Sequence, residues 1–349
     1  MLQPTQRPPV LTAPSADEVD PLGLWSDASL SAVEDLMGRL AVGTRLERSG
    51  HMVQEHLATG GKRLRARLAL AAAEALGGTR APAVAWAAAC ELVHNATLIH
   101  DDLQDGDRVR RGHPTTWVRH GAAQAVNAGD LLLMLPFLAL ETVPVGPDTR
   151  WALARAVARR AEATVRGQSL ELDLLGGRRT DAETWLRATE GKTGALLALP
   201  VEGAALLGGL SSDTAARIAA EFVNIGVLFQ IADDLLDLYG DKGRGERGSD
   251  LREGKVSALV VQHLRLHPDD GPWLLALLEA PRELTPDIDV AFAIDRFRTR
   301  GALAATLQWF ETLAAGVAAA PLLRAIPDLH SVAAELVEQI RGTLPPVRA

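Results

Sequence analysis

The chain has 349 residues, of which 47% are hydrophobic and 23% charged, and its formal net charge is −8. These values are ordinary for a soluble globular protein, and the acidic balance excludes a nucleic-acid binder that works through a general basic field. Arg and Glu interrupt every Ala/Leu-rich run, so no membrane span is expected. The single cysteine, Cys90, cannot form an internal disulfide and favours a reducing compartment, so a cytoplasmic location is expected.

The chain is predicted to form a mobile N-terminal tail followed by one helical domain. Residues 1–23 carry several prolines and no apolar core of signal-peptide type. From residue 24 to residue 349, apolar residues recur at helical spacing, alternating strand-like runs are absent and the gaps are short, which favours a single all-α domain. Helices are predicted around 30–40 and near residues 64–77, 82–104, 118–142, 149–176, 181–208, 212–239, 254–265, 286–315 and 328–343.

Two copies of a DDxxD pattern follow apolar helical segments. The first copy holds Asp101, Asp102 and Asp105, and the second holds Asp233, Asp234 and Asp237. Residues four apart lie on one face of a helix, so each copy offers a pair of carboxylates that suits Mg²⁺ together with substrate phosphates. One isolated copy is more simply a solvated helix end. Two copies, each preceded by an apolar segment, favour a metal-bridged diphosphate site beside a cavity for an apolar tail.

Basic residues supply the rest of an anion site. Lys62 and Arg65 follow a pair of glycines at the start of a predicted helix, whose N-terminal amides also favour phosphate. Further candidates are Arg110, Arg111, Lys192 and Lys255. Singly, each of these is more simply a solvated surface charge. Together with two metal sites, they predict two anionic pockets, one bridged by metal and one bound directly by Lys and Arg.

The ordered set of motifs resembles that of the trans-isoprenyl diphosphate synthases, also called polyprenyl synthetases. Between residues 55 and 265 the chain contains GGKRLR, HNATLIHDDLQD, RRGHPT, RGQSLEL, GKT, FQIADDLLD and GSDLREGK. The resemblance implies the isoprenoid synthase fold, a single large helical bundle around a central cavity. It implies a Mg²⁺-dependent prenyltransferase that condenses isopentenyl diphosphate head-to-tail with an allylic diphosphate, and a homodimer.

The resemblance also implies a role for each matching residue. A trinuclear Mg²⁺ site, with Mn²⁺ able to substitute, would be organised by Asp101, Asp102, Asp105, Asp233, Asp234 and Asp237. The allylic diphosphate would be bound by Arg110, Lys192 and Lys255. Isopentenyl diphosphate would be bound by Lys62, Arg65, His94 and Arg111, and His94 lies two helical turns before Asp101 on the same face. Thr193, which follows Lys192 in the sequence, and Gln230 would lie beside the developing carbocation.

The helix before Asp101 is expected to set the product length. Ala96 and Thr97 stand where short-chain members commonly carry an aromatic stopper, so the cavity floor must lie lower. The next candidates on this face are Leu92 or Val93, then Ala89, then Trp86, which lies roughly 15 Å below Ala96. This depth favours a twenty-carbon product, geranylgeranyl diphosphate. A longer prenyl diphosphate and farnesyl diphosphate are the alternatives.

Two other functions share parts of this pattern. A class I terpene cyclase would share the fold and the first motif, but its second metal site usually has an Asn/Asp–Ser/Thr–Glu pattern. A regulatory subunit of a heteromeric synthase usually lacks one metal motif, and both are present here. The loop at residues 240–250 departs from the family pattern, because Arg244 and Arg247 stand where many members carry a lysine. The role of this loop is left open.

Overall fold

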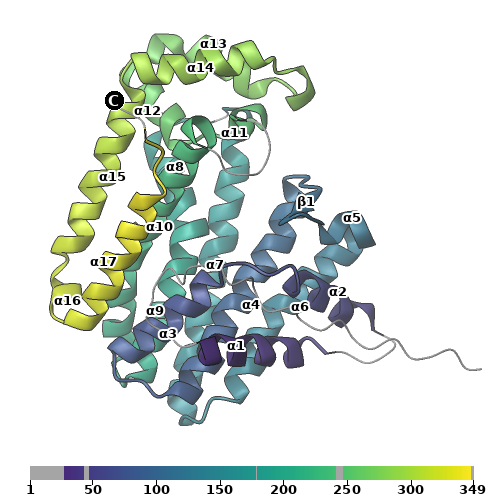
Figure 1. Cartoon of the computed structure of the whole chain (residues 1–349), viewed down its shortest axis with the longest axis vertical. Coiled ribbons are helices and arrows are strands. Elements are labelled where there is room, and N and C mark those ends of the chain that lie inside the picture. Colours follow the sequence, from purple (N-terminus) through teal and green to yellow (C-terminus); the bar gives the residue numbers. More distant parts are fainter. Residues whose placement is uncertain (1–26, 43–46, 178, 241–246, 347–349) are drawn as a thin grey trace, which may run out of the picture.

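The computed structural model describes residues 27–42, 47–177, 179–240 and 247–346, and these are almost entirely helical (Figure 1). The predicted tail, residues 1–23, lies outside these ranges, as does Arg244. The first half contains α1 (Asp27–Leu40), α2 (Arg48–Leu57), α3 (Leu64–Ala75), α4 (Arg80–Gln104), the strands β1 (Val109–Arg110) and β2 (His113–Pro114), α5 (Thr116–His120), α6 (Ala122–Glu141) and α7 (Pro147–Leu174).

The second half begins with a 3₁₀ turn, η1 (Leu175–Gly177), and continues the helical bundle. Its elements are α8 (Ala182–Thr189), the π-helical turn η2 (Glu190–Gly194), α9 (Ala195–Leu207), α10 (Ser212–Tyr239), α11 (Ser249–Arg252), α12 (Ala258–Leu266), η3 (Pro268–Asp270), α13 (Gly271–Glu279), η4 (Arg282–Leu284), α14 (Asp287–Thr299), α15 (Ala302–Ala319), α16 (Pro321–Arg324) and α17 (Pro327–Gly342). The predicted all-α fold is therefore confirmed.

The predicted helices differ from the observed ones mainly at glycines. The helix expected at 118–142 is divided at Gly121, and the one expected at 286–315 is divided at Gly301. These glycines have φ of 86° and 82°, values that residues with a Cβ atom rarely adopt, so each helix ends there. The helix expected at 181–208 is interrupted by η2. The short helices α2, α11, α13 and α16 were not predicted.

One small hairpin is an exception to the expected absence of strands. Val109 pairs with Pro114 and Arg110 with His113, in antiparallel register. The two turn residues, Arg111 and Gly112, have φ of 52° and 76°, the positive values that a type I′ hairpin turn requires. The hairpin projects beyond the end of α4 (Figure 1), and it carries two of the arginines that were predicted to bind diphosphate.

Helix α4 lies in the middle of the bundle, packed against α3, α6 and α9 (Figure 1). Its alanines from Ala83 to Ala96 are buried, which allows the neighbouring helices to approach closely. The large side chain of Trp86 is also fully buried. Its ring occupies the space that a Cβ atom of Gly203 on α9 would need, and its Nε1 donates a hydrogen bond to the Pro200 carbonyl at 2.8 Å. Trp86 therefore anchors α4 to α9.

Helices α6 and α10 are long and apolar enough to cross a membrane by length and composition alone. Both belong to the bundle, where α6 packs on α4 and α10 packs on α9, and 44% and 56% of their most apolar windows are buried. Packing in the core of a helical bundle also accounts for the apolar composition of these two helices. The absence of a membrane span and the cytoplasmic location stay predictions.

Candidate active site

The first aspartate motif stands at the carboxyl end of α4. Asp101 and Asp102 lie in its last turns, and Asp105 caps the helix by donating its backbone N–H to the Asp101 carbonyl at 2.8 Å. The side chain of Asp102 is 1% exposed, whereas those of Asp101 and Asp105 are 18% and 14% exposed. Carboxylates are unfavourable at this negative end of the helix dipole, so the site requires cations.

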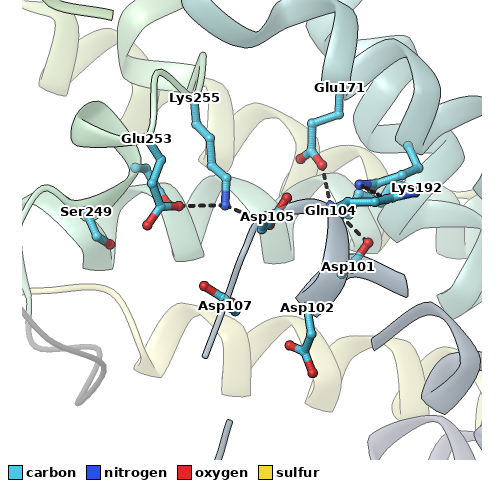
Figure 2. Close-up of polar contacts among 12 residues, drawn as sticks. Asp101, Asp102, Gln104, Asp105, Asp107, Glu171, Lys192, Ser249, Glu253 and Lys255 are labelled. Carbon is cyan, nitrogen blue, oxygen red and sulfur yellow. Dashed lines mark hydrogen bonds and ion pairs between the residues drawn. The ribbon is translucent and has the colours of Figure 1, made fainter. Parts of the chain in front are cut away.

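Cationic side chains from distant parts of the chain meet these carboxylates (Figure 2). Lys255 Nζ lies 3.0 Å from Asp105 Oδ2, and Lys192 Nζ lies 3.8 Å from Asp101 Oδ1. Arg110, on the hairpin, donates from Nε to Asp102 Oδ1 at 2.5 Å. The three residues predicted to bind the allylic diphosphate therefore converge on the first motif.

Two glutamates that the sequence analysis did not single out hold the lysines from the other side (Figure 2). Lys192 also donates to Glu171 of α7, and Lys255 Nζ lies 2.9 Å from Glu253 Oε2. Both glutamates occur in stretches that carried the family resemblance, RGQSLEL and GSDLREGK. Their spacing to the lysines gave no signal, because Glu171 and Lys192 belong to different helices.

The second aspartate motif, on α10, has backbone partners. Asp234, which is 3% exposed, accepts the Ala258 N–H at 2.7 Å, at the start of α12. Asp237, which is 4% exposed, accepts the Ser249 hydroxyl at 2.7 Å and the Asp250 N–H at 3.2 Å. Asp233 is half-buried. The motif thus ties α10 to the segments that contain α11 and the start of α12, and its role in binding metal stays a prediction.

A continuous series of contacts joins the two motifs. Thr193, next to Lys192, donates to Gln230 Oε1 at 3.2 Å, and Gln230 Nε2 donates to Asp234 at 2.9 Å. Asp234 then holds the start of α12, three residues after Lys255, which returns to Asp105. These contacts therefore bring Lys192, Thr193, Gln230 and Lys255 together between the two motifs.

Lys192 and Thr193 lie on the π-helical turn η2, which is clamped between α7 and α10 by glycines. A Cβ atom on Gly167 of α7 would lie 2.6 Å from the Gly191 carbonyl carbon. A Cβ atom on Gly226 of α10 would collide with Gly194 and would lie 3.0 Å from the Thr193 carbonyl carbon. π-Helical turns are rare and often occur at functional sites. Here the turn brings Lys192 toward α4 and Thr193 toward α10.

Burial changes the acidity of the first motif. It raises the pKa of Asp101 to about 6; Lys192 opposes this shift, whereas Glu171 and Asp105 add to it. Burial likewise raises the pKa of Asp102 to about 6, against the attraction of Arg110. The pKa values of Lys192 and Lys255 lie above their ordinary value despite burial, because carboxylates surround both ammonium groups. The site therefore favours positive charge close to its carboxylates.

A second basic cluster lies where the Gly60–Gly61 turn meets the hairpin. Arg111 donates from Nη1 to the Gly60 carbonyl, and its guanidinium fills the space that a Cβ atom on Gly61 would need. Arg63 is left-handed, with φ of 51°, and donates from Nη2 to the Leu57 carbonyl at 2.8 Å. Arg63 and Arg111 are the two non-glycine residues with positive φ among those described, and such strain concentrates at functional sites.

The other residues predicted to bind isopentenyl diphosphate lie near this cluster. Arg65, on α3, stacks 6.0 Å from the ring centroid of Phe229 on α10. Burial lowers the pKa of His94 well below its ordinary value, and the nearby charges of Arg65 and Arg111 lower it further. His94 is therefore neutral near pH 7 and can donate or accept a hydrogen bond without adding charge. Lys62, which directly follows the two glycines, is exposed.

The residues predicted to set the product length lie along α4. Ala96, Val93, Leu92, Ala89 and Trp86 are fully buried. Thr97 is half-buried and donates its hydroxyl to the His94 carbonyl at 2.7 Å. The small side chains of Ala96 and Thr97 therefore lie nearest the motif, and the large, fixed Trp86 lies deeper along α4. Their effect on product length stays a prediction.

A divalent cation fits the end of α4. Asp102 Oδ2 is buried and accepts no hydrogen bond from the described ranges. Ionisation of Asp101 is costly because its carboxyl group is buried and because the charges of Glu171 and Asp105 lie nearby. In these ranges no three Asp, Glu, His or Cys side chains are close enough to hold a metal by themselves. That arrangement suits Mg²⁺, which binds through one or two carboxylates and takes its other ligands from water and phosphate.

Comparison with known proteins agrees with this geometry. The model of the polyprenyl synthetase family matches residues 47–294, more than half of the chain. A short chain isoprenyl diphosphate synthase of Methanothermobacter thermautotrophicus is 33% identical over 287 residues, which cover 81% of this chain and 86% of the relative. A geranylgeranyl diphosphate synthase of Mycobacterium tuberculosis is 34% identical over 275 residues, 77% of each chain.

The fold is also that of solved members of the family. A polyprenyl synthase from Caulobacter crescentus CB15, crystallised with calcium and isoprenyl diphosphate, matches with a TM-score of 0.79 at 26% identity. The match covers 94% of this chain and 98% of that one. The chain therefore belongs to the polyprenyl synthetase family and is a trans-isoprenyl diphosphate synthase, a prenyltransferase that elongates prenyl diphosphate chains.

Proposed function

We propose that this synthase adds isopentenyl diphosphate to an allylic diphosphate and releases geranylgeranyl diphosphate as its main product. The observation that supports the proposal is the series of contacts that joins both aspartate motifs to Lys192 and Lys255, beside a separate cluster around Arg65 and Arg111. One pocket then suits a metal-bridged diphosphate, and the other suits a diphosphate bound directly by cations.

In the first pocket, Arg110, Lys192 and Lys255 would bind the allylic diphosphate. Three Mg²⁺ ions, or Mn²⁺ in their place, would be held by the aspartates of both motifs and would stabilise the departing pyrophosphate. Lys192 and Lys255 already form ion pairs with these aspartates. Their ammonium groups can therefore also bind the phosphate oxygens on which negative charge develops. The allylic C–O bond breaks with its electron pair on the leaving pyrophosphate.

In the second pocket, Lys62, Arg65, His94 and Arg111 would hold isopentenyl diphosphate with its double bond toward the allylic cation. The double bond attacks this cation, a C–C bond forms, and the released pyrophosphate takes the proton that is then lost. The oxygens of Thr193 and Gln230 lie within one hydrogen bond of each other. Their dipoles would stabilise positive charge at the reacting carbon.

The experiment that tests this function is an incubation with radiolabelled isopentenyl diphosphate, Mg²⁺ and, in turn, each allylic primer from five to twenty carbons. A discrete elongated product, resolved by chain length, is expected with at least one primer. No elongation, with or without a candidate partner subunit, would contradict the proposal. Hydrocarbon release from geranylgeranyl diphosphate alone would then indicate a terpene cyclase.

The twenty-carbon product is proposed from the side chains along α4. Ala96 is buried and small, so the growing chain can pass it, whereas Trp86 is large and fixed to α9. Ala96→Phe should therefore shorten the main product by one or two five-carbon units, measured by the chromatography of labelled products. An unchanged product distribution would place the cavity floor elsewhere. A longer main product of the native enzyme would favour the long-chain alternative, and a fifteen-carbon product would indicate a farnesyl diphosphate synthase.

We also propose that the enzyme is a homodimer formed through α6 and α7. These neighbouring helices expose Met134, Leu138, Trp151 and Val165, with 56%, 45%, 66% and 63% of each residue accessible. Exposed apolar side chains that form a contiguous patch mark an interaction surface, and a patch on this face would suit a second copy of the chain. Met134→Glu with Leu138→Glu should convert a dimer to a monomer in sedimentation, whereas Ile288→Glu, at a 75% exposed site on α14, should not.

A further inference from the structure

Glu91 of α4 is a buried acid on the inner side of the second basic cluster. It is 2% exposed and lies one helical turn before Asn95, whose Nδ2 donates to the Glu91 carbonyl at 2.7 Å. Glu91 Oε2 accepts the backbone N–H of Ala66, in the first turn of α3, at 3.2 Å. Its other oxygen, Oε1, lies 3.9 Å from Arg63 Nη1. A single carboxylate therefore contacts both the start of α3 and an arginine of the glycine turn.

Glu91 also acts on Arg65, the arginine that the proposed function places on isopentenyl diphosphate. Burial lowers the pKa of Arg65, and the charge of Glu91 opposes this shift. A buried guanidinium is costly when no ligand is bound, unless a negative charge lies close to it. The carboxylate supplies the charge while it is bound to the amide of the residue that follows Arg65.

The cluster around Arg65 and His94 contains buried polar atoms without a hydrogen-bond partner among the described residues. These atoms include Arg65 Nε and His94 Nδ1. Buried unpaired polar atoms are costly, and several together indicate a polar ligand. Burial lowers the pKa of His56 to about 3, and Arg111, Arg110 and Arg63 lower it further, so the imidazole is neutral. The surroundings of these atoms are strongly cationic, which specifies an anion.

We propose that Glu91 is a positioning residue of the isopentenyl diphosphate pocket. It fixes the first turn of α3 and holds Arg65 behind the pocket, so that the unpaired side of the guanidinium faces the diphosphate. This inference rests on the proposed function, because it assigns the second pocket to isopentenyl diphosphate. Glu91 does not touch the substrate; it acts through Arg65 and the α3 backbone.

The test compares two buried glutamates that pair with arginines. Glu91→Gln keeps the shape and an acceptor for the Ala66 amide but removes the charge. Glu202→Gln is the matched control, because Glu202 of α9 is 5% exposed and its Oε2 lies 2.6 Å from Arg160 Nη2 of α7, in a different part of the bundle. Glu91→Asp retains the charge on a shorter side chain and provides a second variant if Glu91→Gln does not fold.

The measurements are the KM for each substrate, kcat, and calorimetric binding of isopentenyl diphosphate alone in EDTA. Glu91→Gln should raise both the KM and the Kd for isopentenyl diphosphate about tenfold, the effect of losing one charged hydrogen-bonding partner. The KM for the allylic diphosphate should stay within about twofold. Glu91→Asp should give an intermediate KM, and Glu202→Gln should leave both KM values unchanged.

The outcomes separate this proposal from the proposed function. If the native enzyme elongates a primer and Glu91→Gln leaves the KM for isopentenyl diphosphate unchanged, the role of Glu91 is wrong and the function stands. An equal rise in both KM values, or the same change in Glu202→Gln, would show a merely structural role. If the native protein does not elongate but Glu91→Gln weakens its binding of isopentenyl diphosphate, the positioning role stands and the function fails. No binding of isopentenyl diphosphate by the native protein would overturn both.

Discussion

The two aspartate motifs share one spacing but have different partners. In the first motif, the carboxylates of Asp101 and Asp105 face the flexible side chains of Lys192 and Lys255. In the second, Asp234 and Asp237 accept backbone N–H groups at the starts of α12 and α11. Side-chain cations can exchange one anion for another, whereas backbone amides cannot move without unfolding their segment. The carboxylates of the first motif can therefore exchange their lysine partners for other cations, whereas those of the second motif also stabilise the fold.

This difference shows why a pattern of identical residues does not define identical roles. The first motif ends a helix at the surface of the site, and the pKa values of Asp101 and Asp102 are raised by burial that the nearby cations only partly offset. The chain leaves the second motif and comes back to the site at Lys255. The carboxylates of the second motif hold the segments that contain α11 and the start of α12, on either side of Lys255. A substitution in this motif is therefore expected to change both catalysis and stability.

The largest expected effect is on turnover. Asp101→Ala and Asp233→Ala should each lower kcat by about two to three orders of magnitude or more, because each removes a carboxylate predicted to hold the metal ions that stabilise the leaving pyrophosphate. Turnover of isopentenyl diphosphate at several Mg²⁺ concentrations measures this effect. Near-normal rates in either variant would contradict the metal assignment for that motif.

Stability should separate the motifs next. Asp237→Ala leaves the Ser249 hydroxyl and the Asp250 N–H without their acceptor, so it should lower the free energy of unfolding by about 1–3 kcal/mol. Asp101→Ala should not lower it, because the buried Asp101 carboxylate is costly to ionise at neutral pH. Urea unfolding of the protein in EDTA compares the two. Equal losses of stability would remove the distinction drawn between the motifs.

A smaller effect is expected where the two motifs are joined through η2. Gly226→Ala would place a Cβ atom against Gly194 and close to the Thr193 carbonyl carbon, so η2 must shift away from α10. Misplacing Thr193 and Lys192 should lower kcat about tenfold or more. The matched control is Gly38→Ala on α1, where a Cβ atom would meet nothing within 4 Å. A normal kcat in Gly226→Ala would show that the position of η2 is not critical.

The smallest effect concerns an aspartate outside the site. Asp270 of η3 accepts hydrogen bonds from His263 of α12 and Arg296 of α14, and these bonds hold its pKa below the ordinary value. An acid with a lowered pKa stabilises the fold above its unfolded-state pKa of about 4 and loses that contribution as the pH falls below it.

Asp270→Asn should therefore lower the melting temperature by a few degrees at pH 7, and the difference from the native protein should shrink below pH 4. Melting curves of both proteins from pH 3 to pH 7 measure this difference. A difference that stays constant over the whole range would show that ionisation of Asp270 does not contribute. The pKa of Asp101 is raised, so ionisation of its carboxyl group should lower the melting temperature at pH 7 rather than raise it.

The sequence by itself determined the helical character of the chain, the family and the identity of the two motifs. Apolar residues at helical spacing predict α3, α4, α7 and α10 because a helix depends on residues three or four apart. The same locality explains the errors. The breaks at Gly121 and Gly301 depend on positive φ values, which a glycine permits but does not require. The turn η2 needs packing against two other helices, and no local pattern specifies it.

Only the tertiary structure decided which charges meet. Lys255 contacts Asp105 across 150 positions of sequence, and Arg111 reaches the glycine turn across 51. Glu91, Glu171 and Glu253 gave no signal, because a glutamate on a helix is most often solvated and its burial depends on what packs against it. Short-range periodicity fixes an element, whereas electrostatic pairing depends on how elements pack in space. The residues that hold the lysines and Arg65 in place therefore became visible only in the folded chain.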